Sequence, residues 1–126
     1  MTEERPPRVL VIDDDPSVRQ VVRFLLAAFG YESHTAADGP SGLVELARGG
    51  WDLVVTDLEM PEMNGWHVIE AIRQRVPTMP IVMITAFSDP DVMRRAGELG
   101  VPVIAKPFAM ATLKAVVGEA LRRTPS

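Results

Sequence analysis

The segment Val-Leu-Val-Ile-Asp-Asp-Asp-Pro, residues 9–16, joins four apolar residues to three aspartates and a proline. A short apolar run that stops at polar residues is typical of a buried strand. Asp15 followed by Pro16 is typical of a helix start, because an aspartate caps free N–H groups and proline needs no N–H partner there. The segment therefore predicts a strand that leads into a helix, with acidic side chains where the strand ends.

The same alternation continues along the whole chain. We expect strands at 8–12, 31–36, 52–56, 80–84 and 101–105. We expect helices at about 16–29, 40–48, 66–75, from 88 or 89 onward, and around 113–121. The second strand is the most polar and should lie nearer an edge. Strands that alternate with helices predict a parallel sheet covered on both faces, a five-stranded α/β sandwich.

Composition limits the class of protein. The chain has 126 residues, 47% of them hydrophobic and 24% charged, which suits one globular domain. We expect a single domain over 1–126 with its core at about 8–123. The absence of cysteine excludes disulfides and thiolate metal sites.

Hydropathy and net charge also bear on where the protein is located and what it binds. No apolar run approaches the roughly 18 residues that a membrane span needs, and the N-terminus has no signal-peptide core, so we expect a cytoplasmic protein that does not contact membranes. A net charge of −4 argues against nucleic-acid binding by this chain alone. The short polar lead after Met1 favours a domain that begins its chain, either as a stand-alone regulator or ahead of a further domain.

Polar side chains follow four of the five predicted strands. Asp13, Asp14 and Asp15 follow the first strand, Asp57 the third, Thr85 the fourth and Lys106 the fifth. Ligands of open α/β sheets bind outside the carboxyl ends of the strands, where these groups would meet.

The chemistry of this set favours phosphoryl transfer. Two carboxylates about 4 Å apart repel each other by roughly 4 kcal/mol at an effective dielectric of 20, so a cation should compensate them. Mg²⁺ typically takes one or two carboxylates, water and phosphate oxygens. A carboxylate can also attack phosphorus, while Lys106 pairs with a phosphoryl oxygen and Thr85 donates to another.

Four strings extend this interpretation to a family. VLVIDDDP (9–16), VVTDLEMPEMNG (54–65), IVMITAF (81–87) and VIAKPF (103–108) resemble, in order and spacing, the receiver domain of bacterial two-component response regulators. Each string alone is weak evidence, but four in register are specific. The resemblance runs from about Arg8 to Arg123.

The resemblance implies a fold and a site. The fold would be a flavodoxin-like, doubly wound sheet of five parallel strands in the order 2-1-3-4-5, with five helices. Asp13 and Asp14 would hold Mg²⁺, with Mn²⁺ as a substitute. Asp57 would be both a ligand and the phosphoacceptor, and the backbone carbonyl of Glu59 would complete the metal site. Thr85 would be the switch hydroxyl, and Lys106 would precede a cis bond to Pro107.

Partners are also implied. The phosphoryl donor would be a sensor histidine kinase, a phosphotransfer protein of a phosphorelay, or a small acyl phosphate. The receiver would catalyse its own phosphorylation and slow dephosphorylation without being a conventional enzyme. A downstream effector would bind the region 89–123, and the chain would be a monomer or a phosphorylation-linked dimer.

The sequence departs from the family pattern at one switch position. Receivers often carry an aromatic residue where this chain has Val103, so activation would rely on Thr85 and backbone shifts. In the family, the positions of Glu59 and Phe87 tune how readily water reaches the phosphoryl group. A bulky Phe87 would shield that group, whereas an acidic Glu59 would order a water beside it, so the two residues act in opposite directions. Asp15 is interpreted as an N-cap, and His34 and His67 are too isolated to form a ligand pair.

Other functions remain open from the residues alone. A phosphohydrolase of the haloacid-dehalogenase type would use Asp13 and Asp15 as its Asp-x-Asp pair, but it leaves Asp57 and the loop after it unexplained. A receiver-like module that is never phosphorylated would be expected to lack an acidic residue or the lysine. A flavin-binding domain would need a phosphate loop where this chain is acidic.

Overall fold

Five parallel strands form one sheet in the order β2-β1-β3-β4-β5, in a computed structural model that describes residues 5–122. The strands are β1 (Arg8–Ile12), β2 (Glu32–Ala36), β3 (Leu53–Asp57), β4 (Ile81–Thr85) and β5 (Val103–Ala105). The helices are α1 (Pro16–Ala28), α2 (Gly39–Ala47), α3 (Gly65–Arg75), α4 (Pro90–Glu98) and α5 (Met110–Arg122). The predicted fold class is confirmed, including the place of β2 at an edge. Arg123, the end of the predicted core and of the predicted effector region, lies outside the described residues, as do residues 1–4 at the start of the polar lead.

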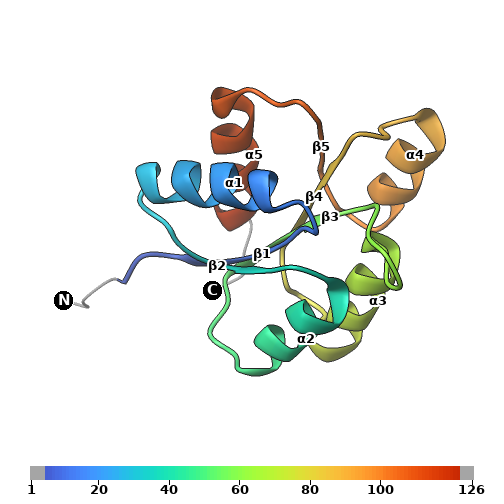
Figure 1. Cartoon of the computed structure of the whole chain (residues 1–126). Coiled ribbons are helices and arrows are strands. Elements are labelled where there is room, and N and C mark those ends of the chain that lie inside the picture. The colour runs from blue at the N-terminus through green and yellow to red at the C-terminus, as the bar shows by residue number, and fades with distance from the viewer. Residues whose placement is uncertain (1–4, 123–126) are drawn as a thin grey trace.

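Helices cover both faces of the sheet because the central strands β1, β3 and β4 are apolar on both sides. Side chains alternate along a strand, so Val9 and Val11 pack with α1 and α5, whereas Leu10 and Ile12 pack with α2 and α3. The two apolar clusters lie on opposite faces of the sheet, and α1 and α5 are seen together on one side of it in Figure 1. α4 joins the α2 and α3 face through the buried Ala96.

Helix starts are set by side-chain caps. Asp15 accepts a hydrogen bond from the backbone N–H of Ser17, as expected for an N-cap before Pro16. Asp89 caps α4 in the same way. Gly30 has φ +96° just after α1, the left-handed conformation that ends a helix. The turn residues read from the sequence therefore fix the helix boundaries to within a few positions.

The last strand is shorter than predicted. β5 begins at Val103 rather than at residue 101. Pro102 has no N–H to give to the sheet, and the N–H of Val101 bonds the carbonyl of Ala96 at the end of α4 instead.

None of the helices within residues 5–122 combines the length and the apolar character that a membrane crossing needs.

Candidate functional site

The site lies where the connections leave the sheet in opposite directions. β1 and β3 are neighbours, yet the chain runs from β1 to the edge strand β2 and from β3 to β4 on the other side. Open α/β sheets form their ligand crevice at such a switch point. Asp13 follows β1 and Asp57 ends β3, so this topology brings residues 44 positions apart in the chain together.

Three carboxylates meet at this point. Asp13, Asp14 and Asp57 each offer an oxygen, and these oxygens all lie within 4.8 Å of one another. Asp13 and Asp57 are buried, whereas Asp14 is exposed. Backbone N–H groups orient the buried pair, because Asp15 donates to Oδ1 of Asp13 and Leu58 donates to Oδ1 of Asp57. The cluster can hold a metal ion, since clustered oxygens with an open side suit a hard divalent cation.

Lys106 supplies the positive charge at the site. Its Nζ lies 3.3 Å from Oδ2 of Asp13 and 3.3 Å from Oδ1 of Asp57. The backbone holds it in place, because its N–H donates to the carbonyl of Thr85 at the end of β4. The bond from Lys106 to Pro107 is cis, as the resemblance implied.

Burial sets the electrostatics of the two partners. The pKa of Asp57 is raised to about 6, chiefly by desolvation and then by the nearby Asp13 carboxylate, while Lys106 acts in the opposite direction. The pKa of Lys106 is also raised, because Asp13 and Asp57 together outweigh the lowering effect of burial, which is the largest single cause. The lysine therefore stays charged, and a cation bound beside Asp57 would favour the ionised form of this carboxyl group.

Thr85 is fully buried, and its hydroxyl is engaged in two directions. It donates to Oε1 of Glu59 over 3.0 Å and accepts the N–H of Phe87 over 2.9 Å. The bond to Glu59 was not anticipated from the sequence, where Glu59 was assigned only its backbone carbonyl and a capacity to order water. The contact joins side chains 26 positions apart, and no spacing in the chain signals it.

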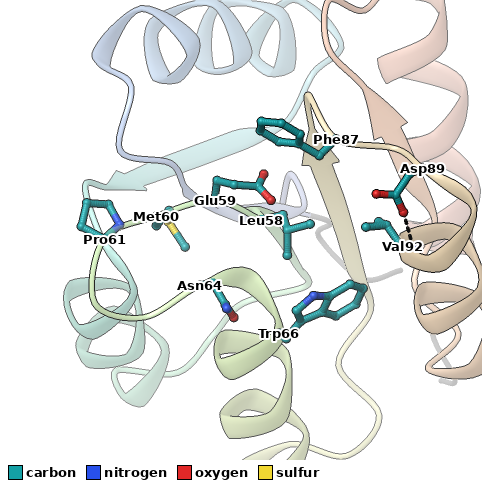
Figure 2. A pocket seen from close by; sticks show the side chains of 9 residues that line it. All are labelled: Leu58, Glu59, Met60, Pro61, Asn64, Trp66, Phe87, Asp89 and Val92. Carbon is teal, nitrogen blue, oxygen red and sulfur yellow. Dashed lines mark hydrogen bonds between the residues drawn. The ribbon is translucent and has the colours of Figure 1, made fainter.

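A groove of about 660 Å³ adjoins the carboxylates through Leu58 and Glu59, which follow Asp57. The groove runs between the loop after β3 and the start of α4, as Figure 2 shows. Phe87 stands at its edge and is 59% exposed, and Trp66 lines its α3 side. The site thus opens onto a half-apolar surface rather than ending at the acidic cluster.

The start of α3 packs directly against the backbone of Asp57. A Cβ on Gly65 would lie 2.6 Å from the carbonyl oxygen of Asp57, so only glycine fits there. The N–H of Gly65 bonds the carbonyl of Leu58. Asn64 and His67 close this helix end through a capping box, a structural role for His67 that the sequence did not suggest.

The structure brings most of the predicted site residues together. Asp13, Asp14, Asp57 and Lys106 form one cluster, and Thr85 lies beside it on β4, joined to Glu59. The remaining candidates have other surroundings. His34 packs against Trp51, His67 caps α3, and Val103 packs in the core on the α3 face.

These features define a receiver-type α/β switch domain, and the comparisons with known proteins agree. Residues 9–118 match the family model described as the response regulator receiver domain, so the chain belongs to that family of two-component signalling proteins.

Curated relatives show the same domain in several settings. The chain is 38% identical over 117 residues to "Probable transcriptional regulator ycf27" of Porphyridium aerugineum, covering 92% of this chain and 48% of that protein. It is 37% identical to "Sensory transduction protein RegX3" of Mycolicibacterium smegmatis, covering 91% and 50%. It is 35% identical to "Sensor histidine kinase RcsC" of Salmonella typhimurium, covering 92% and 13%. The chain thus spans about half the length, or less, of these relatives.

Solved structures are similar over nearly their whole length. The chemotaxis protein CheY4 of Vibrio cholerae matches with a TM-score of 0.85 and 31% identity, covering 91% of this chain and 98% of that one. The response regulator protein TrrA of Thermotoga maritima, solved in complex with Mg(2+)-BeF, matches with a TM-score of 0.82 and 32% identity, covering 90% and 98%.

Proposed function

We propose that Asp57 is the phosphoacceptor of this receiver domain. The observation that carries the proposal is the placement of Lys106, whose Nζ contacts both buried carboxylates within a cluster of three. The partly buried ammonium of Lys106 offsets one of the three carboxylates and leaves a formal charge of −2, so two further positive charges are expected at the site. That balance suits a divalent cation that arrives together with a phosphoryl group.

Mg²⁺ fits the donor set best. Asp13, Asp14 and Asp57 would hold it, with the backbone carbonyl of Glu59 as a fourth ligand and Mn²⁺ as a substitute. A bound Mg²⁺ supplies charge neutralisation for the phosphoryl oxygens during transfer. The Mg(2+)-BeF complex of TrrA supports this choice, because that relative is 32% identical and shares the fold.

The transfer itself needs little from the protein beyond positioning and charge. A carboxylate oxygen of Asp57 forms the new bond to phosphorus as the bond from phosphorus to the donor nitrogen or oxygen breaks. The electron pair of that bond leaves with the donor, which is a phosphohistidine or a small acyl phosphate. Lys106 then pairs with one phosphoryl oxygen and the Thr85 hydroxyl donates to another.

A sensor histidine kinase or a phosphotransfer protein is the proposed donor, and membership of the receiver family supports this class of partner. For the output we propose the surface of α4, β5 and α5, within residues 89–123, as the effector-binding region. Relatives named as transcriptional regulators and as a sensor kinase show that the same domain occurs in proteins of different kinds.

Intact mass measurement tests the proposal. The protein is incubated with Mg²⁺ and acetyl phosphate, with and without EDTA, beside Asp57→Asn. We expect an adduct of about 80 Da, the mass of one phosphoryl group, which depends on Mg²⁺ and is absent from the variant. An adduct that survives in Asp57→Asn but disappears in Asp13→Asn would indicate the haloacid-dehalogenase chemistry instead. The absence of any adduct, together with absence of Mg²⁺ binding, would indicate an unphosphorylated interaction module.

A further inference from the structure

We propose that Glu59 is a positioning residue that latches the switch hydroxyl of Thr85 in the unphosphorylated protein. This inference rests on the proposed function, because the latch opens when a phosphoryl group arrives on Asp57. Its basis is the 3.0 Å hydrogen bond from Oγ1 of Thr85 to Oε1 of Glu59.

The latch follows because the Thr85 hydroxyl can donate only one hydrogen bond. Thr85 has a single hydroxyl hydrogen, so it donates either to Glu59 or to a phosphoryl oxygen, and not fully to both. Thr85 is 0% exposed, and a buried donor without an acceptor is costly. The hydroxyl therefore stays with the Glu59 carboxylate until another strong acceptor comes within reach.

Charge gives the direction of the exchange. A phosphoryl group adds about −1.5 to −2 charge at neutral pH, and Glu59 lies two residues after its attachment point at Asp57. The like charge repels the Glu59 carboxylate, whose exposed position lets it move into water. Phosphorylation thus weakens the old acceptor and supplies a new one in the same event.

The other side of Thr85 connects this exchange to the surface. Its Oγ1 also accepts the N–H of Phe87 over 2.9 Å, which ties the hydroxyl to the loop before α4. Glu59 and Phe87 line the same groove and lie across from one another in Figure 2. A shift of Thr85 therefore changes the groove directly, and it needs no aromatic residue at position 103.

A double-mutant cycle measures the latch. The protein, Glu59→Ala, Thr85→Val and the double variant are titrated with beryllofluoride, a stable phosphoryl analogue, in Mg²⁺, and binding is followed by the fluorescence of Trp66 in the groove. We expect Glu59→Ala to bind the analogue about two- to tenfold more tightly, the range of one hydrogen bond, because no carboxylate competes for the hydroxyl. The effect should disappear when Thr85→Val is also present, since no hydroxyl then remains.

Two readouts separate the latch from general charge effects. Glu62→Ala removes the same charge from the same loop and should leave analogue affinity within about twofold of the parent. In the unphosphorylated protein, Glu59→Ala should move the Phe87 amide resonance toward its position in the analogue-bound protein, and Glu62→Ala should not. Thr85→Ser, which keeps the hydroxyl, should retain the effect of the Glu59 substitution.

The outcomes are distinguishable from failure of the proposed function. Equal tightening by Glu59→Ala in the parent and in the Thr85→Val variant would show a through-space charge effect and overturn the latch. An unchanged Phe87 resonance in Glu59→Ala would also overturn it, even if Asp57 takes the phosphoryl group normally. If the parent protein binds no analogue and forms no adduct, the proposed function fails, and the Phe87 resonance still decides whether the Glu59 to Thr85 bond holds that loop.

Discussion

Nζ of Lys106 lies 3.3 Å from Oδ1 of Asp57, so the carboxylate proposed for phosphorylation is paired with the lysine before any phosphate arrives. The same oxygen accepts the N–H of Leu58. The Asp57 carboxylate is therefore held in a fixed orientation, and the lysine already lies beside the group proposed to take the phosphoryl charge. This arrangement separates the role of Lys106 in transfer from any role in metal binding.

Replacing Lys106 by methionine should affect these two roles in opposite directions. Phosphorylation by acetyl phosphate should slow by about 10²-fold, the usual effect of removing one charged donor from a transition state. Mg²⁺ should bind more tightly, because the lysine charge no longer opposes the cation among three carboxylates. Lys114→Met, on the exposed side of α5, is the matched control for charge. Weaker Mg²⁺ binding in Lys106→Met would contradict the separation.

The pH dependence of stability should reveal the burial of Asp57. Its pKa is about 6 in the folded protein, against an ordinary value of 3.8, so the folded state binds more protons than the unfolded state between these values. The metal-free protein should therefore lose stability as the pH rises from about 4 to 6 and change little from this group above that range. The loss should be on the order of 1–3 kcal/mol, because one pKa unit corresponds to about 1.4 kcal/mol.

Asp57→Asn isolates that contribution. Urea unfolding in EDTA should show the variant to be more stable than the parent at pH 7, with the difference shrinking toward pH 4. Carboxylates far from Asp57 contribute equally to both proteins and cancel in the difference. A difference that does not vary with pH would show that the Asp57 carboxyl titrates normally in the folded protein.

The fold could be read from the sequence because local and global signals agree. The apolar runs that end at Asp13, Asp57 and Thr85 are strands in the structure, and the caps at Asp15 and Asp89 start their helices. Most boundaries moved by a single residue, and the start of β5 moved by two because Pro102 has no N–H to give to the sheet. The spacing of apolar residues indicates which positions are buried, and the turn residues indicate where elements end. In this chain both signals predicted the same strands and helices.

The sequence predicted which residues form the site, but it did not predict all the contacts between them. The strand-end rule gathered the carboxylates and Lys106, because parallel strands place their ends at one edge. The bond between Thr85 and Glu59 depends on a side-chain rotamer and on a partner 26 residues away, and neither leaves a pattern in one sequence. The close approach of Gly65 to Asp57 has the same character, because one sequence does not show which backbone atoms face a glycine.

Gly65→Ala should disturb the site through the backbone. The added Cβ would lie 2.6 Å from the carbonyl oxygen of Asp57 and 2.9 Å from Cα of Leu58, and neither is a flexible side-chain end. We expect a loss of about 1–3 kcal/mol in unfolding free energy and slower phosphorylation. Gly97→Ala is the matched control, because nothing lies within 4 Å of its added Cβ on α4, and alanine there should stabilise the helix by about 0.5–1 kcal/mol. Both effects can be followed by thermal unfolding and by the rate of adduct formation.

The two adjacent aspartates after β1, Asp14 and Asp15, allow a test of metal binding. Asp14 belongs to the carboxylate cluster, whereas Asp15 accepts the N–H of Ser17 as the cap of α1. Mg²⁺ at about one hundred times its dissociation constant should stabilise the parent by about 2.7 kcal/mol, because it binds only the folded state. Asp14→Asn should lose most of this gain and keep its stability in EDTA, since Asp14 is exposed. Asp15→Asn should retain the full gain, because asparagine caps a helix as well as aspartate. The two variants remove the same charge from neighbouring positions, so equal losses of the Mg²⁺ effect would show general electrostatic attraction rather than coordination by Asp14.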